Sequence, residues 1–427
     1  MDYGIVKTLA VNVFISIAAG FSASHFIKEF IPIFIQRKLY GTDQCKVNKT
    51  PIAEPAGVIA AAVYLIFIFI FIPIPLYEWS NEIVLDRREI SSFAYIRLIS
   101  LLAAIISICT AILLGFSDDI LDLRWRHKLL FPTLSSLPLL LVYYISIRIV
   151  DDVDSDNSTS MLLPVFARNI FGATYVDLGP LFYVYMMMLV TFCTNAINII
   201  AGINGVEAGQ AIVIATSVAL FNIVQIFRLD RTLVWYHSLS LCILLPFIST
   251  SLALFLFNRY PARVFVGDTY CCWAGVTLAV VAIIGHFSKT LILFLLPQIV
   301  NFLYSVPQLF HLIPCPRHRL PKLNSESGCL DMSMVEFEPA KLSRPGGLCL
   351  RILIAFRLVH HREFKRDDTD WMEINNLTIL NFLLKCGGPM HERDLTNRFL
   401  ALQVVCSAIG FVCRFYFAYL LYGTVYH

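Results

Sequence analysis

The sequence predicts an all-α polytopic membrane protein with about ten transmembrane helices and a small α+β cytosolic insert between helices nine and ten. Of its 427 residues, 58% are hydrophobic and only 15% are charged, which is far less charge than the surface of a soluble protein of this size carries. The apolar residues also gather in runs of about 20, the length that crosses a bilayer as a helix. The lipid bilayer is therefore an expected partner, whereas a net charge of +3 does not indicate a nucleic-acid-binding protein.

Ten segments are long and apolar enough to span a membrane. They lie near residues 7–35, 57–77, 94–115, 129–149, 178–198, 206–227, 234–256, 271–285, 288–312 and 398–422. The division between the eighth and ninth segments depends on Gly285, His286 and Ser288, which interrupt one long apolar run. These segments divide the chain into three parts. We expect a transmembrane core over 1–312, a cytosolic insert over 313–397, and a tenth helix with a lumenal C-terminus over 398–427.

The charges of the loops predict the orientation. Lys and Arg concentrate in alternate loops, at 37–49, 124–128 and 259–263 and throughout 313–397. Cytoplasmic loops carry such an excess of basic residues. We therefore place these loops in the cytosol and both termini on the opposite side, which in a eukaryotic cell would be the lumen of the endoplasmic reticulum.

The insert carries its own local patterns. Residues 332–338 alternate partly between apolar and polar side chains, and 348–359 are apolar and β-prone, so both stretches predict strands. Residues 376–386 have the pattern of a short amphipathic helix, which a Gly-Gly-Pro sequence then ends.

The first polar cluster covers residues 115–128, with the sequence GFSDDILDLRWRHK. A solvated basic loop would explain its Arg and Lys residues, but not the adjacent Asp118 and Asp119, because acids beside a membrane do nothing for topology. Carboxylates are the preferred ligands of Mg²⁺, and a nearby cation such as Lys128 can hold a phosphate. The pattern therefore favours a catalytic site over a plain loop.

The second polar cluster covers residues 195–210, with the sequence NAINIIAGINGVEAGQ. Asn195 and Asn198 would share one face of a helix, and Gly202 and Gly205 would end that helix and let backbone amides approach a ligand. Asn side chains can bind a metal or the edge of a uracil. A polar turn between two spans is the alternative, but it needs fewer Asn and Gly residues.

Two further motifs are weaker. Residues 265–269 (FVGDT) place Asp268 at a glycine turn, which an ordinary loop explains equally well. Residues 314–319 (PCPRHR) place two Arg around a His, and Arg makes planar two-point contacts with phosphate; a basic flank of the ninth helix is an equal alternative. Acids, amides and basic groups on one membrane face together indicate phosphoryl-transfer chemistry.

These four motifs, in this order, resemble the polyprenyl-phosphate N-acetylhexosamine-1-phosphate transferase family, and most closely its eukaryotic branch. The resemblance covers nearly the whole chain. It implies a ten-helix membrane fold, Mg²⁺ as the cofactor, a cytosolic active site in the membrane of the endoplasmic reticulum, UDP-GlcNAc as the donor and dolichyl phosphate as the acceptor. A homodimer is compatible with apolar outer helix faces but is not required by them.

The resemblance also implies roles for individual residues. Those at the metal and the acceptor would be Asn198 and Asp268 as Mg²⁺ ligands, Lys128 at the dolichyl phosphate, and Asp118 and Asp119 as groups that order the catalytic centre. Those at the substrates would be Arg317 on the diphosphate, His318 and Arg319 at the sugar, Phe265 stacked on uracil, Gly202 and Asn204 beside it, Glu54 at the nucleotide or sugar end, and Trp125.

Several alternatives stay open on sequence alone. The phosphate of the acceptor could attack the donor directly, with or without Asp118 as a base, or an aspartyl intermediate could form. A transporter also has many spans with polar residues, and Lys28 and Glu29 near the end of the first span are its best support. A bacterial-type relative with another donor or acceptor, and a non-catalytic scaffold, are the other possibilities.

Overall fold

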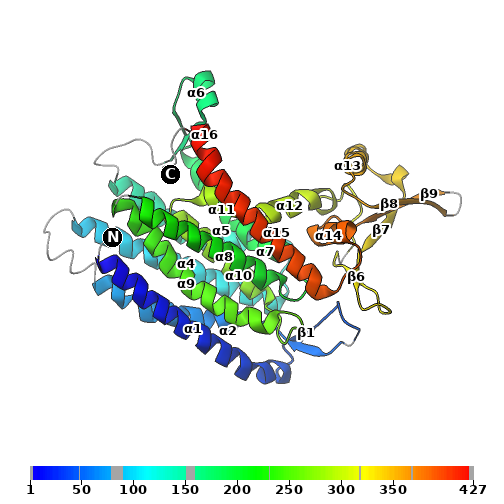
Figure 1. Cartoon of the computed structure of the whole chain (residues 1–427), viewed down its shortest axis with the longest axis horizontal. Helices are drawn as coiled ribbons and strands as arrows, with labels where there is room; N and C mark the ends of the chain where they lie inside the picture. The colour runs from blue at the N-terminus through cyan, green and yellow to red at the C-terminus, as the bar shows by residue number, and fades with distance from the viewer. Residues whose placement is uncertain are drawn as a thin grey trace.

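The computed structural model describes residues 3–47, 49–77, 90–150, 159–229, 231–316, 319–366 and 369–422. Long helices lie side by side as a bundle, and a small domain of strands and short helices projects from one end of it (Figure 1). Within the described residues, nine helices are long and apolar enough to cross a membrane, or ten if a bent pair counts as one span. The predicted polytopic helical fold is confirmed.

The spanning helices agree with the predicted segments to within a few residues at most ends. Their bounds are α1 (Tyr3–Gln36), α2 (Gly57–Phe71), α4 (Ile90–Leu121), α5 (Trp125–Val150), α7 (Pro180–Ile199), α8 (Val206–Arg228), α9 (Arg231–Asn258), α10 (Gly267–Ile284) and α15 (Glu392–Val412), which continues through the π-helical turn η2 (Cys413–Phe417) into α16 (Ala418–Tyr422).

Three of the predicted spanning helices differ in the structure. The expected ninth helix is two helices, α11 (Ser288–Phe294) and α12 (Leu296–Leu309), which meet at an angle of 71°. Pro297, in the first turn of α12, cannot donate the backbone hydrogen bond that would continue α11. The third helix, α4, runs on past residue 115, so Asp118 and Asp119 lie in its last turn rather than in a loop. The tenth begins at Glu392 rather than near 398.

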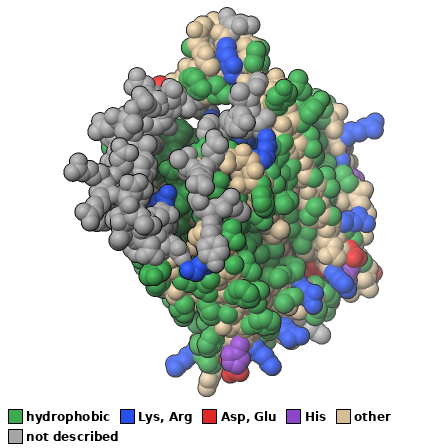
Figure 2. Space-filling view, turned by 60° about the vertical axis from the view of Figure 1, so that its left-hand side comes forward, with side chains coloured by type: hydrophobic (Ala, Val, Ile, Leu, Met, Phe, Trp, Pro, Cys, Tyr) green, Lys and Arg blue, Asp and Glu red, His purple; other side chains and the backbone are tan. Residues whose placement is uncertain are grey.

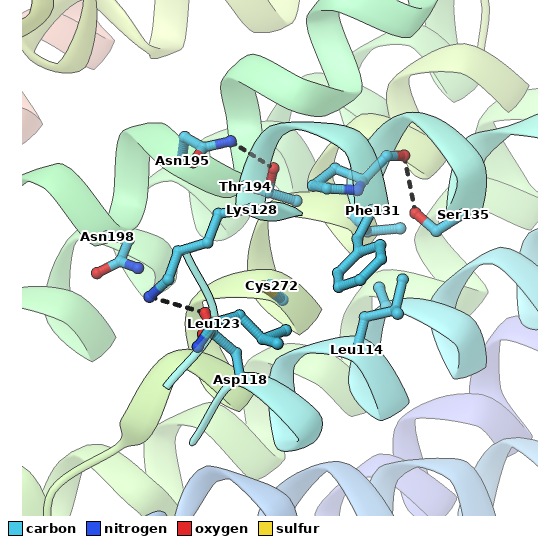
Figure 3. A pocket seen from close by; sticks show the side chains of 13 residues that line it. Leu114, Asp118, Leu123, Lys128, Phe131, Ser135, Thr194, Asn195, Asn198 and Cys272 are labelled. Carbon is cyan, nitrogen blue, oxygen red and sulfur yellow. Dashed lines mark hydrogen bonds and ion pairs between the residues drawn. The ribbon is translucent and has the colours of Figure 1, made fainter. Parts of the chain in front are cut away.

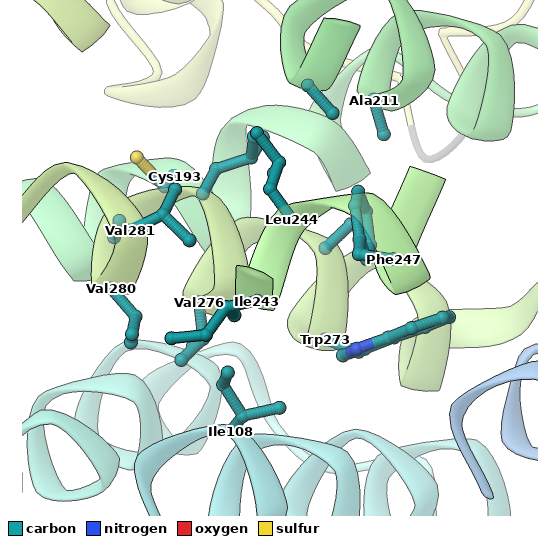
Figure 4. Close-up of a cluster of buried hydrophobic side chains, with 14 of the residues drawn as sticks. Ile108, Cys193, Ala211, Ile243, Leu244, Phe247, Trp273, Val276, Val280 and Val281 are labelled. Carbon is teal, nitrogen blue, oxygen red and sulfur yellow. The ribbon is translucent and has the colours of Figure 1, made fainter. Parts of the chain in front are cut away.

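Helix α10 is the centre of the bundle. It packs against α4, α7 and α9, and nearly all of its side chains are buried. Figure 4 shows Trp273 of α10 near Phe247 of α9, and their ring centroids lie 5.0 Å apart. A helix that is apolar on every side belongs in an interior. The bundle therefore fixes the position of the first turn of α10, which carries Asp268.

The outer surface of the bundle is apolar. Phe14, Phe21 and Phe227 each expose about three quarters of their surface, at 74%, 75% and 75%. Hydrophobic side chains cover much of the face seen in Figure 2. Water would penalise so large an apolar surface, whereas lipid does not. The surface thus agrees with a membrane setting.

The projecting domain lies between α12 and α15. It contains the hairpin β5 (Lys322–Leu323) and β6 (Leu330–Asp331), an antiparallel sheet in the order β7 (Met334–Phe337), β9 (Thr369–Asn375) and β8 (His361–Arg366), the short helix η1 (Pro339–Lys341), α13 (Arg344–Ala355) and α14 (Ile379–Gly387). The strand within 332–338 and the helix within 376–386 agree with the sequence prediction.

The predicted strand at 348–359 is wrong, because most of this stretch belongs to helix α13. The hydroxyl of Ser343 accepts a hydrogen bond from the backbone N–H of Gly346 and so caps the start of the helix. Leu350 and Leu353 are three residues apart and are both buried against the sheet side of the domain. Helical spacing of the buried leucines therefore outweighs the β-propensity of the segment.

Two further hairpins were not predicted. At the end of the bundle far from the projecting domain, β3 (Ser160–Leu162) pairs with β4 (Tyr175–Asp177) around the short helix α6 (Val165–Phe171). At the near end, β1 (Tyr40–Thr42) pairs with β2 (Pro51–Ala53). Backbone hydrogen bonds join this second hairpin to the segment before α10, between Ala53 and Phe265 and between Ala56 and Phe265, each 2.9 Å long. They bring Glu54 next to Phe265.

Candidate active site

A cavity of about 570 Å³ opens at the end of the bundle that carries the projecting domain. Its walls come from the first hairpin, the end of α4, the turn between α7 and α8, and the start of α10. Eight of the residues predicted from sequence line it, namely Glu54, Asp118, Asp119, Asn198, Gly202, Asn204, Phe265 and Asp268. Motifs that lie far apart in the chain therefore meet at one cavity.

Asp119 holds the start of α10. Its carboxylate accepts hydrogen bonds from the backbone N–H groups of Asp268, at 2.6 Å, and Thr269, at 2.8 Å, and from the Thr269 hydroxyl. The first N–H groups of a helix have no partner within it, so Asp119 of α4 caps α10. Gly267 permits this approach, since its φ is +75° and a Cβ there would lie 2.3 Å from Pro55.

Lys128 joins two of the predicted carboxylates. Its Nζ lies 2.8 Å from Asp118 Oδ2 and 2.6 Å from Asp268 Oδ2, and Figure 3 shows the lysine reaching toward Asp118 with Asn198 nearby. Asp268 Oδ1 also accepts a hydrogen bond from Asn198 Nδ2 at 2.8 Å. Helices α4, α5, α7 and α10 thus each contribute one side chain to a single polar cluster.

A smaller cavity of about 30 Å³ adjoins this cluster. Asp118, Lys128 and Asn198 form its polar end, and Leu114 and Phe131 lie among the side chains that line the rest. Asp118 and Asn198 line both cavities. The polar cluster is therefore placed where a wide polar cavity meets an apolar crevice between helices.

The polar cluster fits a magnesium ion by the chemistry of its donors. The carboxylates of Asp118 and Asp268 and the amide oxygen of Asn198 are hard oxygen ligands, which Mg²⁺ prefers. Asp119 lines the same cavity, so three carboxylates lie close to one Lys128 ammonium, and their excess negative charge would attract a cation.

Asn204, on the opposite wall, is held by three hydrogen bonds from distant parts of the chain. Its backbone N–H donates to Glu392 Oε1 at 2.7 Å, its carbonyl accepts from the Thr396 hydroxyl at 3.0 Å, and its side-chain amide donates to Asp43 Oδ2 at 3.2 Å. Lys46 forms an ion pair with Asp43 at 3.0 Å. The start of α15 and the first loop together fix this wall.

Sequence reasoning missed four of the residues that hold this wall. Asp43, Glu392 and Thr396 hold Asn204, and Glu207 accepts a hydrogen bond from the Gly202 backbone N–H at 2.8 Å. Glu207 stands inside the Asn- and Gly-rich motif, so an acid beside a glycine turn was a usable signal. The other three lie far from the motifs, and nothing local in the sequence indicates their partner.

Asp43, Cys45 and Glu392 form a second group of potential ligands, each with one donor atom within 4.8 Å of the others. Burial, together with the charges of Glu392 and Asp43, raises the pKa of the Cys45 thiol to about 12. The Cys45 thiol donates a hydrogen bond to the Gly202 carbonyl at 3.8 Å, the Cys45 backbone N–H donates to Asp43 Oδ1 at 2.8 Å, and Lys46 already supplies a positive charge to Asp43. This group therefore stabilises the wall as a hydrogen-bonded cluster.

Two glycines, Gly202 and Gly41, let neighbouring segments approach closely at the cavity. Gly202 has a φ of +94°, and a Cβ there would lie 2.3 Å from the Leu320 side chain. A Cβ on Gly41 would lie 2.4 Å from Glu54 Oε2 and 3.0 Å from Phe265. Glycine at these two positions lets the first hairpin and the projecting domain close against the cavity.

Four predicted residues remain, and three of them cannot be placed relative to the cavity. Arg317, His318 and the side chain of Trp125 fall outside the described residues. Arg319 is described: Asn381 donates a hydrogen bond to its carbonyl at 3.0 Å, and its Nη1 is buried without a hydrogen-bond partner. Arg319 precedes Leu320, which lines the cavity, so the basic motif enters the fold directly beside the site.

Glu54 is a titratable group that lines the cavity outside the spanning helices. Burial, and after it the nearby charges of Asp119, Asp268 and Glu207, raise its pKa to about 7. A carboxyl group in this state retains its proton to near neutral pH and can donate a hydrogen bond. The cavity therefore offers both an acceptor-rich cluster and a carboxyl donor opposite it.

The fold and the site define a polytopic helical membrane protein with an acidic, lysine-bridged site at one end of its bundle. The model of glycosyl transferase family 4 matches residues 101–286. A protein of Schizosaccharomyces pombe named UDP-N-acetylglucosamine–dolichyl-phosphate N-acetylglucosaminephosphotransferase is 39% identical, over 96% of this chain and 93% of its own length. Proteins of the same name from Saccharomyces cerevisiae and Dictyostelium discoideum are each 38% identical, over 91% and 94% of this chain and 87% and 88% of their own lengths. The chain belongs to this glycosyl transferase family.

Proposed function

We propose that the protein transfers GlcNAc-1-phosphate from UDP-GlcNAc to dolichyl phosphate, which gives GlcNAc-diphosphate-dolichol and UMP. The observation that carries this proposal is the position of the Lys128 bridge between Asp118 and Asp268, at the junction of a polar cavity and an apolar crevice. A water-soluble nucleotide sugar and a membrane lipid need such a junction in order to react.

The wide cavity suits the donor. Its volume of about 570 Å³ lies in the range of small-molecule sites. Phe265 offers an aromatic face, and Asn204, held in place by Glu392 and Asp43, offers an amide to a uracil edge. Glu54 stands on the same side and would donate to a hydroxyl or carbonyl oxygen. The motif at Arg317, His318 and Arg319 would supply basic contacts to the diphosphate and the sugar.

The crevice suits the acceptor. Lys128 would attract the dolichyl phosphate, and the apolar side chains that include Leu114 and Phe131 would contact the first part of the lipid chain. When the phosphate binds Lys128, it competes with Asp118 and Asp268 for the ammonium group. Acceptor binding therefore frees carboxylate oxygens at the place where a cation would be needed.

The reaction in this proposal is a single displacement. An oxygen of dolichyl phosphate attacks the β-phosphorus of UDP-GlcNAc, a new phosphorus–oxygen bond forms, and the bond to UMP breaks. The acceptor phosphate is largely ionised near neutral pH, so the step needs no strong base. Asn198, Asp268 and Asp118 would hold Mg²⁺, which would neutralise charge on the diphosphate. Asp119 keeps Asp268 in position through the first turn of α10.

The rival mechanism passes through an aspartyl intermediate. Asp119 is a poor nucleophile in this structure because both of its oxygens accept hydrogen bonds from α10. Asp118 has one oxygen at Lys128 and the other at the backbone N–H of Leu123, at 3.0 Å. Exchange of labelled UMP into UDP-GlcNAc without lipid acceptor would support the intermediate; we expect none.

A direct assay tests the function. The purified chain is mixed with UDP-GlcNAc carrying a label in the sugar, dolichyl phosphate and Mg²⁺, and both the label in the lipid phase and released UMP are measured. We expect one UMP for each labelled lipid, and much less product with UDP-GalNAc. Uptake of intact UDP-GlcNAc into proteoliposomes without UMP release would identify a transporter and contradict the proposal.

We also propose that the site faces the cytosol in the membrane of the endoplasmic reticulum. The basic loops at the site end of the bundle support this orientation. Cys386, in the projecting domain, is exposed and offers a test. In sealed microsomes, a membrane-impermeant maleimide should label Cys386 without detergent. Labelling that requires detergent would place the domain, and the site with it, in the lumen.

A further inference from the structure

At the end of the bundle opposite the candidate active site, Arg414 is a buried cation that forms no ion pair with any described residue. Only 8% of its surface is exposed, and its Nε has no hydrogen-bond partner. Its guanidinium lies 5.8 Å from the ring centre of Phe221, a contact that offsets only part of the cost of burial. Arg414 belongs to the π-helical turn η2, and such turns recur at functional sites.

Other polar and basic groups surround Arg414. It lines a cavity of about 20 Å³ together with Gln225, His237 and His286. Arg228 lies beside it, 5.0 Å from the ring centre of Phe415. Three segments far apart in the chain, the end of α8, the start of α9 and the turn after α10, therefore meet η2 at one small cavity with a basic rim.

The described residues provide no carboxylate for this cluster. At this end of the described helices and hairpin, the one acidic residue is Asp177, and its carboxylate accepts hydrogen bonds from the Thr159 hydroxyl and the Gly179 backbone N–H. A buried cation without a counter-charge is costly. Among the described residues Arg414 therefore has no counter-charge, and an anionic ligand would supply one.

The depth of the cluster indicates where that anion comes from. Arg414 lies about six helical turns after Glu392, which corresponds to ~33 Å along the helix. Arg228 lies a similar distance beyond Val206 on α8. The hydrocarbon core of a bilayer is about 30 Å thick. With Glu392 and Val206 placed at the active-site face of the membrane, both cations would lie near the phosphate layer of the other leaflet.

The surface around the cluster is apolar, as a lipid would require. Phe227 on α8 is 75% exposed, and Val412 and Tyr416 beside Arg414 are 52% and 62% exposed. A soluble anion would meet only the basic groups, whereas a phospholipid would satisfy both the cations and this apolar surface.

We propose that this cluster, formed by Arg414, Arg228, Gln225, His237 and His286, binds the phosphate group of an anionic phospholipid. A cavity of about 20 Å³ has room for one water-sized group, so one phosphate oxygen enters it and accepts hydrogen bonds from Arg414. The remaining oxygens stay at the rim near Arg228, and the acyl chains lie against α8 and α15. The site is independent of the transfer reaction and holds α8, α9 and the end of α15 together.

The test is a lipid titration of the purified full-length protein in detergent, followed by its melting temperature. The probes are dioctanoyl phosphatidylglycerol, dioctanoylglycerol, which has no phosphate, and inorganic phosphate. We expect phosphatidylglycerol to raise the melting temperature and the other two to leave it nearly unchanged. The Arg414→Leu variant should need about tenfold more phosphatidylglycerol for the same shift, as the loss of charge-assisted hydrogen bonds predicts.

A control variant, Arg398→Leu, and a second variant at Arg414 complete the test. Arg398→Leu removes an exposed arginine from the other end of α15 and should titrate like the unmodified chain. If Arg414→Leu does not fold, Arg414→Lys, which keeps the charge but loses the Nε donor, should show a smaller loss of lipid response. Equal shifts with dioctanoylglycerol, a shift with inorganic phosphate alone, or an unchanged titration of the Arg414 variants would each overturn the proposal.

Discussion

The acidic cluster around Lys128 and the wall around Asn204 face the same cavity but are held by different parts of the chain. In the cluster, Asp118, Lys128, Asn198 and Asp268 come from the ends of long helices and contact one another directly. All four lie within residues 101–286, which match the family model. The wall depends on the first loop, the projecting domain and the start of α15, all of which lie outside that range.

We infer that the cluster and the wall have different tasks, catalysis and donor binding. Helix ends inside a packed bundle keep charged groups within about 3 Å of one another, which a reaction at a phosphate requires. The wall is assembled from loops, which tolerate sequence change and so can adapt to a particular donor. We therefore expect changes in the cluster to reduce turnover, and changes in the wall to weaken donor binding.

Metal removal should give the largest effect, because it acts on the cluster as a whole. Chelation of divalent cations with EDTA should lower UMP release by ~10³-fold or more, and added Mg²⁺ should restore it, since the three carboxylates would otherwise face the diphosphate uncompensated. Full activity in EDTA would show that Lys128 and the arginines suffice for charge neutralisation.

Asp118→Asn should give the next largest effect. The substitution keeps the shape but weakens the ion pair with Lys128 and removes a charged oxygen ligand, so we expect turnover to fall by ~10²-fold or more. Binding of UDP-GlcNAc should stay close to that of the unmodified chain, because the wall is untouched. Steady-state assays and equilibrium binding measure the two quantities.

The matched control for Asp118 is Asp122→Asn. Asp122 lines the same cavity and has a φ of +47°, a conformation that Asn adopts as readily as Asp. Its turnover should remain within a few-fold of the unmodified chain. If Asp118→Asn behaves in the same way as this control, the acidic cluster has no catalytic part in the reaction.

Glu392→Ala tests the wall. It removes the acceptor of the Asn204 backbone N–H, a bond of 2.7 Å, and one buried hydrogen bond to a charged group corresponds to about a tenfold change in affinity. We expect KM for UDP-GlcNAc to rise by about that factor while kcat changes little. Glu392→Gln, which can still accept the bond, should restore most of the affinity.

Asp394→Ala is the matched control for Glu392, because both acids lie in the first turn of α15 and affect its N-terminus alike. Asp394 is exposed, and its replacement should leave KM unchanged. A fall in kcat without any change in KM for Glu392→Ala would contradict the division between the cluster and the wall.

The smallest effect concerns stability and pH at Glu54. Burial raises the pKa of Glu54 to about 7 from an ordinary value of 4.5. Between these two values the folded chain keeps a proton that the unfolded chain has released, so stability falls as pH rises from about 4.5 to 7. Glu54→Gln should make this pH-dependent loss of stability smaller, by an amount of the order of 1 kcal/mol in the free energy of unfolding.

Melting temperatures at several pH values measure this difference. The control is Glu363→Gln, an exposed position on β8 of the projecting domain. We expect the Glu54→Gln curve to be flatter than the control curve between pH 5 and 7, and parallel to it above about pH 7.5. Identical curves for the two variants would mean that Glu54 is ionised and solvated in the folded chain.

The sequence predicted the polar cluster well, because its signals are local. Paired aspartates at the end of a span and an Asn pair three residues apart are unusual where each polar group near lipid is costly. The structure brings Asp118, Asn198 and Asp268 together as these motifs indicated. Sequence patterns did not reveal that Asp119 caps α10, because a cap supplied by another helix leaves no mark in the sequence beside it.

The predictions from sequence were wrong where contacts between distant segments determine the local structure. The helix α13 looks β-prone in isolation, and the bend between α11 and α12 follows from how Pro297 enters a packed bundle. Likewise, no local pattern connects Glu392 with Asn204, or shows that Arg414 is buried and forms no ion pair with a described residue, since each statement concerns residues far apart in the chain.

By itself the sequence determined the class of the fold, the approximate number of spans and the residue types of the polar cluster, because hydropathy and charge act along the chain over one helix length. Only the tertiary structure decided which carboxylate caps α10, which two carboxylates Lys128 bridges, and which loops form the wall around Asn204. Those assignments depend on how helices from distant segments pack around α10, and packing is a property of the whole chain.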